Sequence, residues 1–390
     1  MHIPAKPASF HDQMTWPRAR AVHHERIRYM RMALRLAEKG AGWTSPNPMV
    51  GAVIVNGGRV VGTGYHRGFG LAHAEPEAIR RAGSRARGAT LYVNLEPCNH
   101  AGQTPPCCEA IVRAGVSMVV VGMKDPNPLV NGRGLARLRR AGVRVMTGVL
   151  ENNAQQLNEP FVTAMRLKRP MVVAKLALSL DGKIAAVGGH SRWISSRESR
   201  HEVHIERARV DAVMVGIETV LHDNPRLTVR CLDHRPNRPV RIIVDSRLRI
   251  PPQARCLGTG APTLIATTVR DVAAHQRLAR PGVSILALPA RHGRVPLAAL
   301  LRLLPSRGIQ SVLLEGGGEL VAGALEERLV DRVLWFIAPM LLGGRKAPSA
   351  IGGSGVKRVS AAIRLEQMRF TDVGPDLCVE ARVVYPRHET

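Results

Sequence analysis

The sequence predicts a two-domain α/β protein. The chain has 390 residues, 45% of them apolar and 22% charged, which is typical of folded domains and not of disordered or fibrous chains. Strand-like runs alternate with helix-like stretches in both halves, as in layered α/β domains, and a polar stretch separates the halves. We therefore expect a poorly ordered extension over 1–24, a first domain over 25–150, a linker over 151–169 and a second domain over 170–390.

The first domain is expected to begin with an amphipathic helix over 28–39, because apolar Met32, Ala33, Leu36 and Ala37 fall on one helical face. Asn-Gly-Gly at 56–58 is a hairpin signal between two strand-like runs. The strands of this domain are expected at 49–55, 60–64, 90–95, 118–122 and 143–149, and its later helices at 73–82, 107–114 and 135–141.

The second domain shows the same alternation without an internal repeat. Its strands are expected at 171–178, 211–215, 240–245, 263–267, 283–288 and 311–315, with helices between several of them.

The charge balance favours anionic partners without specifying one. Lys and Arg total 56 against 30 Asp and Glu, giving a formal net charge of +26. Proteins that hold single-stranded nucleic acid usually combine basic grooves with stacking aromatics, whereas Phe, Trp and Tyr make up only 3% of this chain and do not cluster. A phosphorylated small substrate explains the charge as well as nucleic acid does, and we do not expect nucleic-acid binding.

The cysteines and the apolar runs point to a cytoplasmic protein. Six cysteines in 390 residues are too few for a disulfide framework. The first thirty residues lack the apolar core of a signal peptide, and no segment approaches the ~18 apolar residues of a membrane span. We expect no membrane association and a homo-oligomer of unspecified size.

The first domain contains a set of zinc-type ligands. His73 and Glu75 lie two positions apart, and eight residues separate Cys98 from Cys107. Catalytic zinc commonly has three protein ligands and a water in the fourth position. A deaminase also requires a carboxylate such as Glu75, because the attacking water loses a proton and the departing amine gains one. Two prolines before Cys107 predict a helix start, where the dipole favours its thiolate.

The alternative is a closed, structural zinc site. Such a site needs a fourth ligand, for which Cys108 and His100 are available. Cys108, however, projects about 100° around the helix from Cys107, and a closed site gives no role to Glu75. We therefore favour a catalytic metal site.

Four motifs now suggest a family. They are Thr-Ser-Pro-Asn-Pro-Met-Val-Gly at 44–51, His-Ala-Glu at 73–75, Glu-Pro-Cys-Asn-His at 96–100 and Gly-Gln-Thr-Pro-Pro-Cys at 102–107. Together they closely resemble the bifunctional riboflavin-biosynthesis deaminase/reductases, from about residue 28 to the C-terminus. Other members of the cytidine-deaminase-like superfamily commonly have two residues between their cysteines, so the longer gap is discriminating.

The resemblance implies a cytidine-deaminase-like three-layer domain in which His73, Cys98 and Cys107 bind Zn²⁺ and Glu75 moves protons. The implied substrate is 2,5-diamino-6-(5-phosphoribosylamino)pyrimidin-4-one, which loses its 2-amino group as ammonia, and Asn47 would hydrogen-bond the pyrimidine. Asn47 can also be simply a turn-forming residue. The chain departs from the family at Gln103, where a basic residue is usual, at Ala101, where a larger one is common, and at Pro76, which follows Glu75.

The second domain carries a glycine run after an apolar strand. Leu-Leu-Glu-Gly-Gly-Gly at 313–318 leads into an amphipathic stretch, and a strand, a glycine turn and a helix start can cradle a phosphate. The spacing differs from a Rossmann fingerprint, and such glycines are often only structural.

Further motifs in this half, at 175–184, 191–194, 216–225 and 244–246, resemble the reductase half of the same family. That half has a dihydrofolate-reductase-like fold and uses NADPH to convert a ribosyl group into a ribityl chain. The resemblance implies NADPH contacts from Trp193, Thr219, Asp223, Ser246, Gly317, Gly318 and Gly323. It implies substrate contacts from Ser191, Arg207, Leu227, Arg230 and Glu315.

Arg207 and Arg230 suit the phosphate of the substrate, because a planar guanidinium can donate two hydrogen bonds to a phosphate. In a chain this rich in arginine, the alternative is an ordinary surface residue. Lys175 and Asp181 are pocket residues or salt-bridge partners without an assigned role, and Leu178 replaces a usually smaller residue. No residue is an evident general acid for the reduction.

Two rival functions remain. One is a nucleic-acid base deaminase with a basic C-terminal binding domain, although the second half lacks the aromatic motifs of common RNA-binding modules. The other is a protein whose deaminase half only binds zinc while the reductase works.

Overall fold

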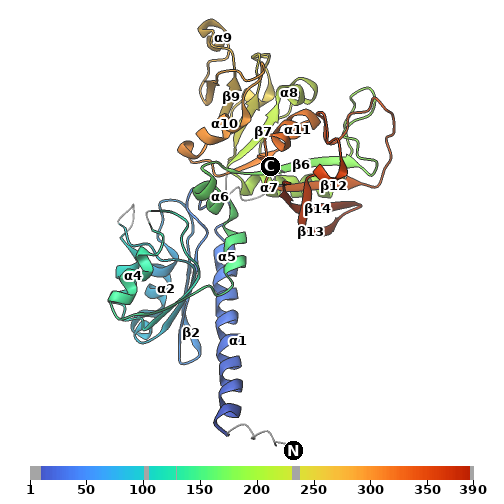
Figure 1. Cartoon of the computed structure of the whole chain (residues 1–390). Coiled ribbons are helices and arrows are strands. Elements are labelled where there is room, and N and C mark those ends of the chain that lie inside the picture. Colours follow the sequence, from blue (N-terminus) through green and yellow to red (C-terminus); the bar gives the residue numbers. More distant parts are fainter. Residues whose placement is uncertain (1–9, 101–104, 129, 231–237, 387–390) are drawn as a thin grey trace, which may run out of the picture. The chain divides into compact units, whose positions relative to one another are not determined.

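The computed structural model describes residues 10–100, 105–128, 130–230 and 238–386. The chain divides into two compact units, Met1–Arg166 and Leu167–Thr390 (Figure 1). Each unit combines one mixed β-sheet with helices, so the predicted α/β class is confirmed.

The sheet of the first unit has five strands in the described residues, in the order β2-β1-β3-β4-β5. β1 is antiparallel to both of its neighbours, whereas β3, β4 and β5 are parallel. The strands are β1 (Gly51–Asn56), β2 (Arg59–Tyr65), β3 (Thr90–Leu95), β4 (Met118–Met123) and β5 (Arg144–Thr147). The predicted hairpin joins β1 to β2, and Gly57 and Gly58 take the positive φ values of 55° and 75° that its turn requires.

Helices cover both faces of this sheet. α1 (Phe10–Glu38) and α5 (Glu151–Leu157) pack on one face, and α2 (Ala74–Ala82), α3 (Cys107–Arg113) and α4 (Arg133–Arg140) pack on the other. Successive strand residues point to opposite faces, so in β1 Val53 contacts the α1 side and Ile54 the α2 side. The result is the three-layer domain expected from the resemblance.

Two segments differ from expectation. The irregular extension expected over 1–24 is helical from Phe10 onward, while residues 1–9 lie outside the described part. Each residue added to an existing helix gains one backbone hydrogen bond, so α1 can continue toward its N-terminus without an apolar stripe in that part. The linker expected over 151–169 is helical, as its composition indicated, and forms α5 and α6 (Glu159–Leu167). It differs in that Ala154 of α5 is fully buried in the core of the first unit, so this part of the segment belongs to that unit.

The sheet of the second unit has nine strands among the described residues, in the order β10-β9-β8-β7-β11-β6-β12-β14-β13. They are parallel except for β14 and β13, which form an antiparallel hairpin at one edge. The strands are β6 (Met171–Ser179), β7 (Ala212–Gly216), β8 (Val240–Val244), β9 (Thr263–Thr267), β10 (Val283–Ala287), β11 (Ser311–Leu314), β12 (Arg332–Ala338), β13 (Arg364–Val373) and β14 (Asp376–Val384).

Helices pack on both faces of the second sheet as well. They are α7 (Arg197–Arg209), α8 (Ile217–Asp223), α9 (Val272–Gln276), α10 (Leu297–Leu303) and α11 (Gly318–Glu326), and short 3₁₀ turns lie at Gly83–Ala86 of the first unit and at Arg255–Leu257, Pro305–Arg307 and Val359–Ala361 of the second. α10 and α11 bury one face, and α8 buries the other. In sheets of this kind, ligands bind beyond the carboxyl ends of the parallel strands.

Candidate functional site

Three ligand-type side chains meet in the first unit. The Nδ1 atom of His73 and the Sγ atoms of Cys98 and Cys107 lie within 4.8 Å of one another. His73 is the residue just before α2, Cys98 follows β3, and Cys107 begins α3. Nδ1 is 3.2 Å from the Cys107 sulfur and 3.6 Å from the Cys98 sulfur. One imidazole and two thiols in this arrangement fit a zinc ion with a fourth position open.

The two sulfurs differ in their readiness to ionise. The Cys107 thiol and the His73 imidazole stabilise the Cys98 thiolate and lower the pKa of Cys98 to about 4. The backbone N–H of Cys107 also donates to the Cys98 sulfur, at 3.4 Å. The same interaction, with burial, raises the pKa of Cys107 well above its ordinary value. The start of α3 therefore favours the thiolate of Cys98, whereas the position of Cys107 at the helix start had indicated that Cys107 would be the thiolate.

Glu75 lies in the first turn of α2 and is 3% exposed. Burial, and after it the charge of Cys98, raises the pKa of Glu75 to about 7. Its carboxyl group interacts with the Cys107 thiol, so the structure brings it to the ligand cluster, as the resemblance implied.

Asn47 lies near the same cluster through its contact with His66, a residue that no sequence motif indicated. The amide nitrogen Nδ2 of Asn47 lies 3.2 Å from Nε2 of His66, and Nδ1 of His66 lies 3.1 Å from the carbonyl oxygen of Ala72. Because a carbonyl only accepts, Nδ1 carries the proton and Nε2 accepts from Asn47. The His66 ring centroid is 5.3 Å from that of His73. Burial lowers the pKa of His66, consistent with a neutral ring, and nothing in its sequence context distinguishes it.

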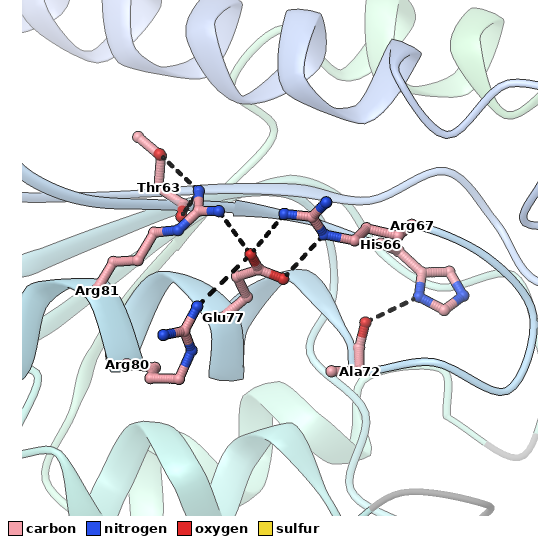
Figure 2. Close-up of polar contacts among 7 residues, drawn as sticks. All are labelled: Thr63, His66, Arg67, Ala72, Glu77, Arg80 and Arg81. Atoms are coloured by element: carbon pink, nitrogen blue, oxygen red, sulfur yellow. Dashed lines mark hydrogen bonds and ion pairs between the residues drawn. The ribbon is translucent and has the colours of Figure 1, made fainter.

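Charged side chains hold α2 against the chain that follows β2. Glu77 accepts hydrogen bonds from Arg67 at 3.1 Å and from Arg81 at 2.7 Å, with Arg80 at 3.9 Å (Figure 2). The hydrogen bond from Arg67 is the main reason why the pKa of Glu77 is lowered. Because Arg67 follows His66 directly, this cluster and the His66 contact with Ala72 both fix the segment that leads into His73.

Glu96, in the Glu-Pro-Cys motif, has a positioning role that was not predicted. Its carboxylate is 3% exposed and accepts four backbone hydrogen bonds, from the N–H groups of Asp125, Gly132, Gly134 and Leu135. It therefore ties the segment after β4 and the start of α4 to the end of β3, two residues before Cys98.

The alternative fourth ligands do not join the described cluster. The thiol of Cys108 donates instead to the carbonyl oxygens of Pro97, at 3.4 Å, and Gly134, at 3.5 Å, while His100 is exposed. Gln103 and Ala101, two of the three departures from the family pattern in this unit, lie outside the described residues.

The expected reductase residues line two adjoining cavities of the second unit. The first, of about 830 Å³, contains Ser191, Trp193, Arg207, Asp223, Leu227, Arg230 and Glu315. The second, of about 900 Å³, contains Ser246, Gly318 and Gly323. Thr219 and Gly317 line both cavities. Every residue of the second unit that is expected to touch NADPH or substrate thus lines one continuous region.

An ion pair between Arg207 and Glu315 forms part of the wall of the first cavity. The guanidinium of Arg207 donates to both carboxylate oxygens of Glu315, at 2.6 and 2.8 Å. Burial alone would raise the pKa of Glu315, but Arg207 and then Lys175 outweigh it and lower that pKa. Burial lowers the pKa of Lys175, which lines the same cavity. Arg207 is therefore partly neutralised before any phosphate binds.

The glycine segment has the shape of a phosphate cradle. Gly317 is the N-cap of α11, and a Cβ atom built on it would meet nothing within 4 Å. A Cβ on Gly318 would lie 2.6 Å from the Ser349 carbonyl oxygen. Gly317 therefore leaves space for a ligand at the positive end of the helix, and Gly318 permits close chain packing. These features fit the pyrophosphate of a dinucleotide.

Trp193 is 67% exposed, and the Arg200 guanidinium carbon lies 4.4 Å from the centre of its ring.

Asp181 lies outside both cavities and accepts hydrogen bonds from the backbone N–H groups of Leu342 and Gly343. Leu178 is a core residue that lines neither cavity. The larger side chain at this position therefore makes up no part of either cavity wall.

Comparisons with known proteins cover both units. The family model "Cytidine and deoxycytidylate deaminase zinc-binding region" matches residues 23–123, and the model "RibD C-terminal domain" matches residues 170–379. The riboflavin biosynthesis protein RibD of Actinobacillus pleuropneumoniae is 42% identical over 92% of this chain and 95% of its own length. That of Escherichia coli is 41% identical over 90% of this chain and 97% of its own.

Solved structures agree over the same span. RibD of Acinetobacter baumannii has a TM-score of 0.84 at 36% identity and covers 93% of this chain and 99% of its own. A diaminohydroxyphosphoribosylaminopyrimidine deaminase/5-amino-6-(5-phosphoribosylamino)uracil reductase from Thermotoga maritima has a TM-score of 0.82 at 37% identity, with the same coverage. The fold, both units and the zinc-type cluster therefore agree, and the chain belongs to the RibD family of bifunctional, Zn²⁺- and NADPH-dependent deaminase/reductases of riboflavin biosynthesis.

Proposed function

We propose that the two units carry out successive reactions on one ribotide. The first unit removes the 2-amino group of 2,5-diamino-6-(5-phosphoribosylamino)pyrimidin-4-one as ammonia. The second reduces the ribosyl group of the product, giving 5-amino-6-(5-phosphoribitylamino)uracil. The substrates in the name of the Thermotoga maritima protein support this assignment, as does the buried Glu75 beside the three zinc-type ligands, which is the observation that carries it.

In the deamination we propose that His73, Cys98 and Cys107 hold the zinc and that Asn47 hydrogen-bonds the pyrimidine. Glu75 accepts a proton from the attacking water and delivers it to the departing amine, so that a C–O bond forms, the C–N bond breaks and ammonia leaves. Bound zinc lowers the pKa of a coordinated water, and bound NADPH supplies a hydride. The Asn47–His66 contact supports the role of Asn47, because it holds the amide beside His73.

In the reduction the protein positions two molecules. Hydride adds to the sugar carbon that bears the amine nitrogen, the bond from that carbon to the ring oxygen breaks, and that oxygen gains a proton. We propose that substrate contacts come from Ser191, Arg207, Leu227, Arg230 and Glu315, and cofactor contacts from Trp193, Thr219, Asp223, Ser246, Gly317, Gly318 and Gly323. Their common lining of the two joined cavities supports this set.

The domain limits are part of the proposal. We assign deaminase activity to 25–150 and reductase activity to 170–390, with 151–169 as the connection. The two compact units and the residues matched by the two family models support the division.

We further propose a cytoplasmic homo-oligomer. Every cysteine in the described part of the chain is free, as a reducing compartment allows. Within that part, no helix has both the length and the apolar character needed to cross a bilayer. The edge strand β13 exposes Met368 and Phe370, which a second copy would cover. Light scattering on the full chain tests this proposal. A monomer mass at micromolar concentration would contradict the proposed oligomer.

One assay tests the reaction sequence. Purified full-length protein with zinc, the diaminopyrimidine ribotide and NADPH should release ammonia and oxidise NADPH in equal amounts. Ammonia release without NADPH oxidation would remove the reductase assignment. Oxidation of NADPH, with reduction of the undeaminated ribotide and no ammonia release, would contradict the proposed order of the two steps. The nucleic-acid alternative is not favoured, because the second unit matches a reductase family instead of a nucleic-acid-binding module.

A further inference from the structure

We propose that Arg247, Arg291 and Arg294 bind the 2′-phosphate of NADPH and so make the second unit prefer NADPH to NADH. This inference rests on the proposed NADPH site. To that site the inference adds the residues that distinguish NADPH from NADH, two cofactors that differ only in the 2′-phosphate.

The arrangement of the cavities sets the direction in which the cofactor lies. The two cavities meet at Ile184, Thr219 and Gly317. The proposed substrate residues all line the first cavity, so the nicotinamide must lie there to deliver a hydride. A dinucleotide that passes Gly317 at the start of α11 then extends its adenosine end into the second cavity, which Arg247, Arg291 and Arg294 line.

A tight turn fixes two of these arginines in place. The backbones of Arg291 and Arg294 exchange two hydrogen bonds of 3.0 Å. His292 and Gly293 between them have φ values of 51° and 70°, as in the two-residue turns of β-hairpins. The turn follows β10 and is not a free loop.

A second hydrogen bond ties this turn to the end of β8. The backbone N–H of Val295 donates to the Ser246 hydroxyl at 3.0 Å, and Arg247 is the next residue after Ser246. The three arginines thus come from two chain segments that the structure holds together beside a proposed NADPH residue. Such preorganisation limits the entropy lost when an anion binds.

The charges in the second cavity leave these three side chains available. Arg249 is already paired with Glu218. Of the other acidic residues lining the cavity, Glu327 accepts from the Ala298 backbone and Glu319 from the Gly353 backbone, while Glu326 lies in the last turn of α11.

Among the residues that the structure describes, no carboxylate forms an ion pair with the side chain of Arg247, Arg291 or Arg294. All three are exposed. A phosphate with about two negative charges and three acceptor oxygens matches such a group of guanidinium donors.

The test compares two cofactors on the full-length, zinc-loaded protein. Isothermal titration calorimetry measures the Kd of NADP⁺ and of NAD⁺ for the wild type and for Arg247→Gln, Arg291→Gln and Arg294→Gln. Arg302→Gln is the matched control, because Arg302 is an exposed arginine of the neighbouring α10 that lines neither cavity. Circular dichroism melting confirms that each variant is folded.

We expect the wild type to bind NADP⁺ more tightly than NAD⁺. Each cavity variant should weaken NADP⁺ binding roughly tenfold, the effect of one lost charge-assisted hydrogen bond, and leave NAD⁺ binding within about twofold. Unchanged NADP⁺ binding, an equal loss for both cofactors, or the same loss in the Arg302 control would overturn the proposal while leaving the reductase assignment intact. Failure of the wild type to bind NADP⁺ would overturn both.

Discussion

One carboxyl group carries the proposed proton transfers of the first unit. Glu75 is buried beside the zinc-type cluster, and its carboxyl group interacts with the Cys107 thiol. The sequence indicated its role because deamination needs a proton carrier near three metal ligands. It did not indicate His66, since a lone histidine at the end of a strand has no distinguishing pattern.

The change Glu75→Gln should lower ammonia release by about 10²- to 10⁴-fold, because the amide cannot accept the proton of the attacking water. The zinc content per chain, measured by atomic emission, should stay unchanged, since Glu75 is not a proposed ligand. Ammonia release within about tenfold of the wild-type rate would contradict the assignment.

The buried histidine His204 makes the second unit sensitive to acid. Burial, and after it Arg207 and Arg230, lowers the pKa of His204 from 6.5 to about 4. Between these two pH values His204 is protonated in the unfolded chain and mostly neutral in the folded chain. The residue therefore lowers the free energy of unfolding as the pH falls from about 6.5 toward about 4. Above pH 6.5 it has no such effect.

At pH 5 the contribution of His204 is about 2 kcal/mol. His204→Asn keeps an acceptor for the backbone N–H of Arg230, which now donates to Nδ1 of the histidine. Urea titrations at pH 7 and pH 5 should therefore show a smaller acid-induced loss of stability in the variant than in the wild type. Equal losses of stability in the variant and the wild type would show that folding does not lower the pKa of His204.

At the scale of elements, one hairpin turn and one helix start were predicted from local signals, whereas the start of α1 was not. Asn-Gly-Gly at 56–58 indicated the β1–β2 turn, and the two prolines indicated the start of α3 at Cys107. Their signals are local, because they depend on backbone conformations that few residues favour.

The last three strands were not predicted. β12 follows soon after α11, whereas a long segment with little regular structure, 339–363, separates β12 from β13 and β14. β13 is exposed along most of its length, so its residues lack a clear alternation. Gly374, with φ 60°, marks the turn between β13 and β14 and was the available signal. The partnership of Glu96 with backbone groups more than 25 residues away also depends on the fold and not on the local sequence.

Two neighbouring glycines in the cradle before α11 should respond differently to alanine. Gly318→Ala should lower the free energy of unfolding by about 1–3 kcal/mol, because its Cβ would lie 2.6 Å from the Ser349 carbonyl oxygen and 3.0 Å from the Gly352 nitrogen. Gly317→Ala should change stability by less than about 0.5 kcal/mol, since its Cβ meets open space.

Gly317→Ala should nevertheless weaken NADP⁺ binding by roughly tenfold, because the methyl group occupies space that the cofactor requires. Denaturant titration and calorimetry measure the two effects separately. A stable Gly317→Ala protein that binds NADP⁺ like the wild type would show that the cofactor does not pass this residue.

At the scale of the whole molecule, the sequence predicted two α/β units from composition and alternation alone. Each unit has its own hydrophobic core: Ile54, Leu91 and Ile111 belong to one, and Leu300, Val312 and Val321 to the other. The identity of each unit came from motifs that hold the reacting groups and not from the alternation, because many functions share these architectures.

Separate cores predict separable activities. A chelator that removes zinc from the full chain should abolish ammonia release, while NADPH oxidation with the deaminated ribotide, 5-amino-6-(5-phosphoribosylamino)uracil, should stay within about twofold. Re-addition of zinc should restore the first reaction. Loss of both activities on chelation would mean that the reductase depends on the metal.

The central claim is that one imidazole and two thiolates hold zinc and leave a position for water. X-ray absorption at the zinc edge of the full-length protein tests it directly. The expected spectrum shows two sulfur ligands at about 2.3 Å and two lighter atoms at about 2.0–2.1 Å, with Cys108→Ser indistinguishable from the wild type. A third sulfur ligand, or a spectrum that changes in Cys108→Ser, would show a closed site and contradict the account.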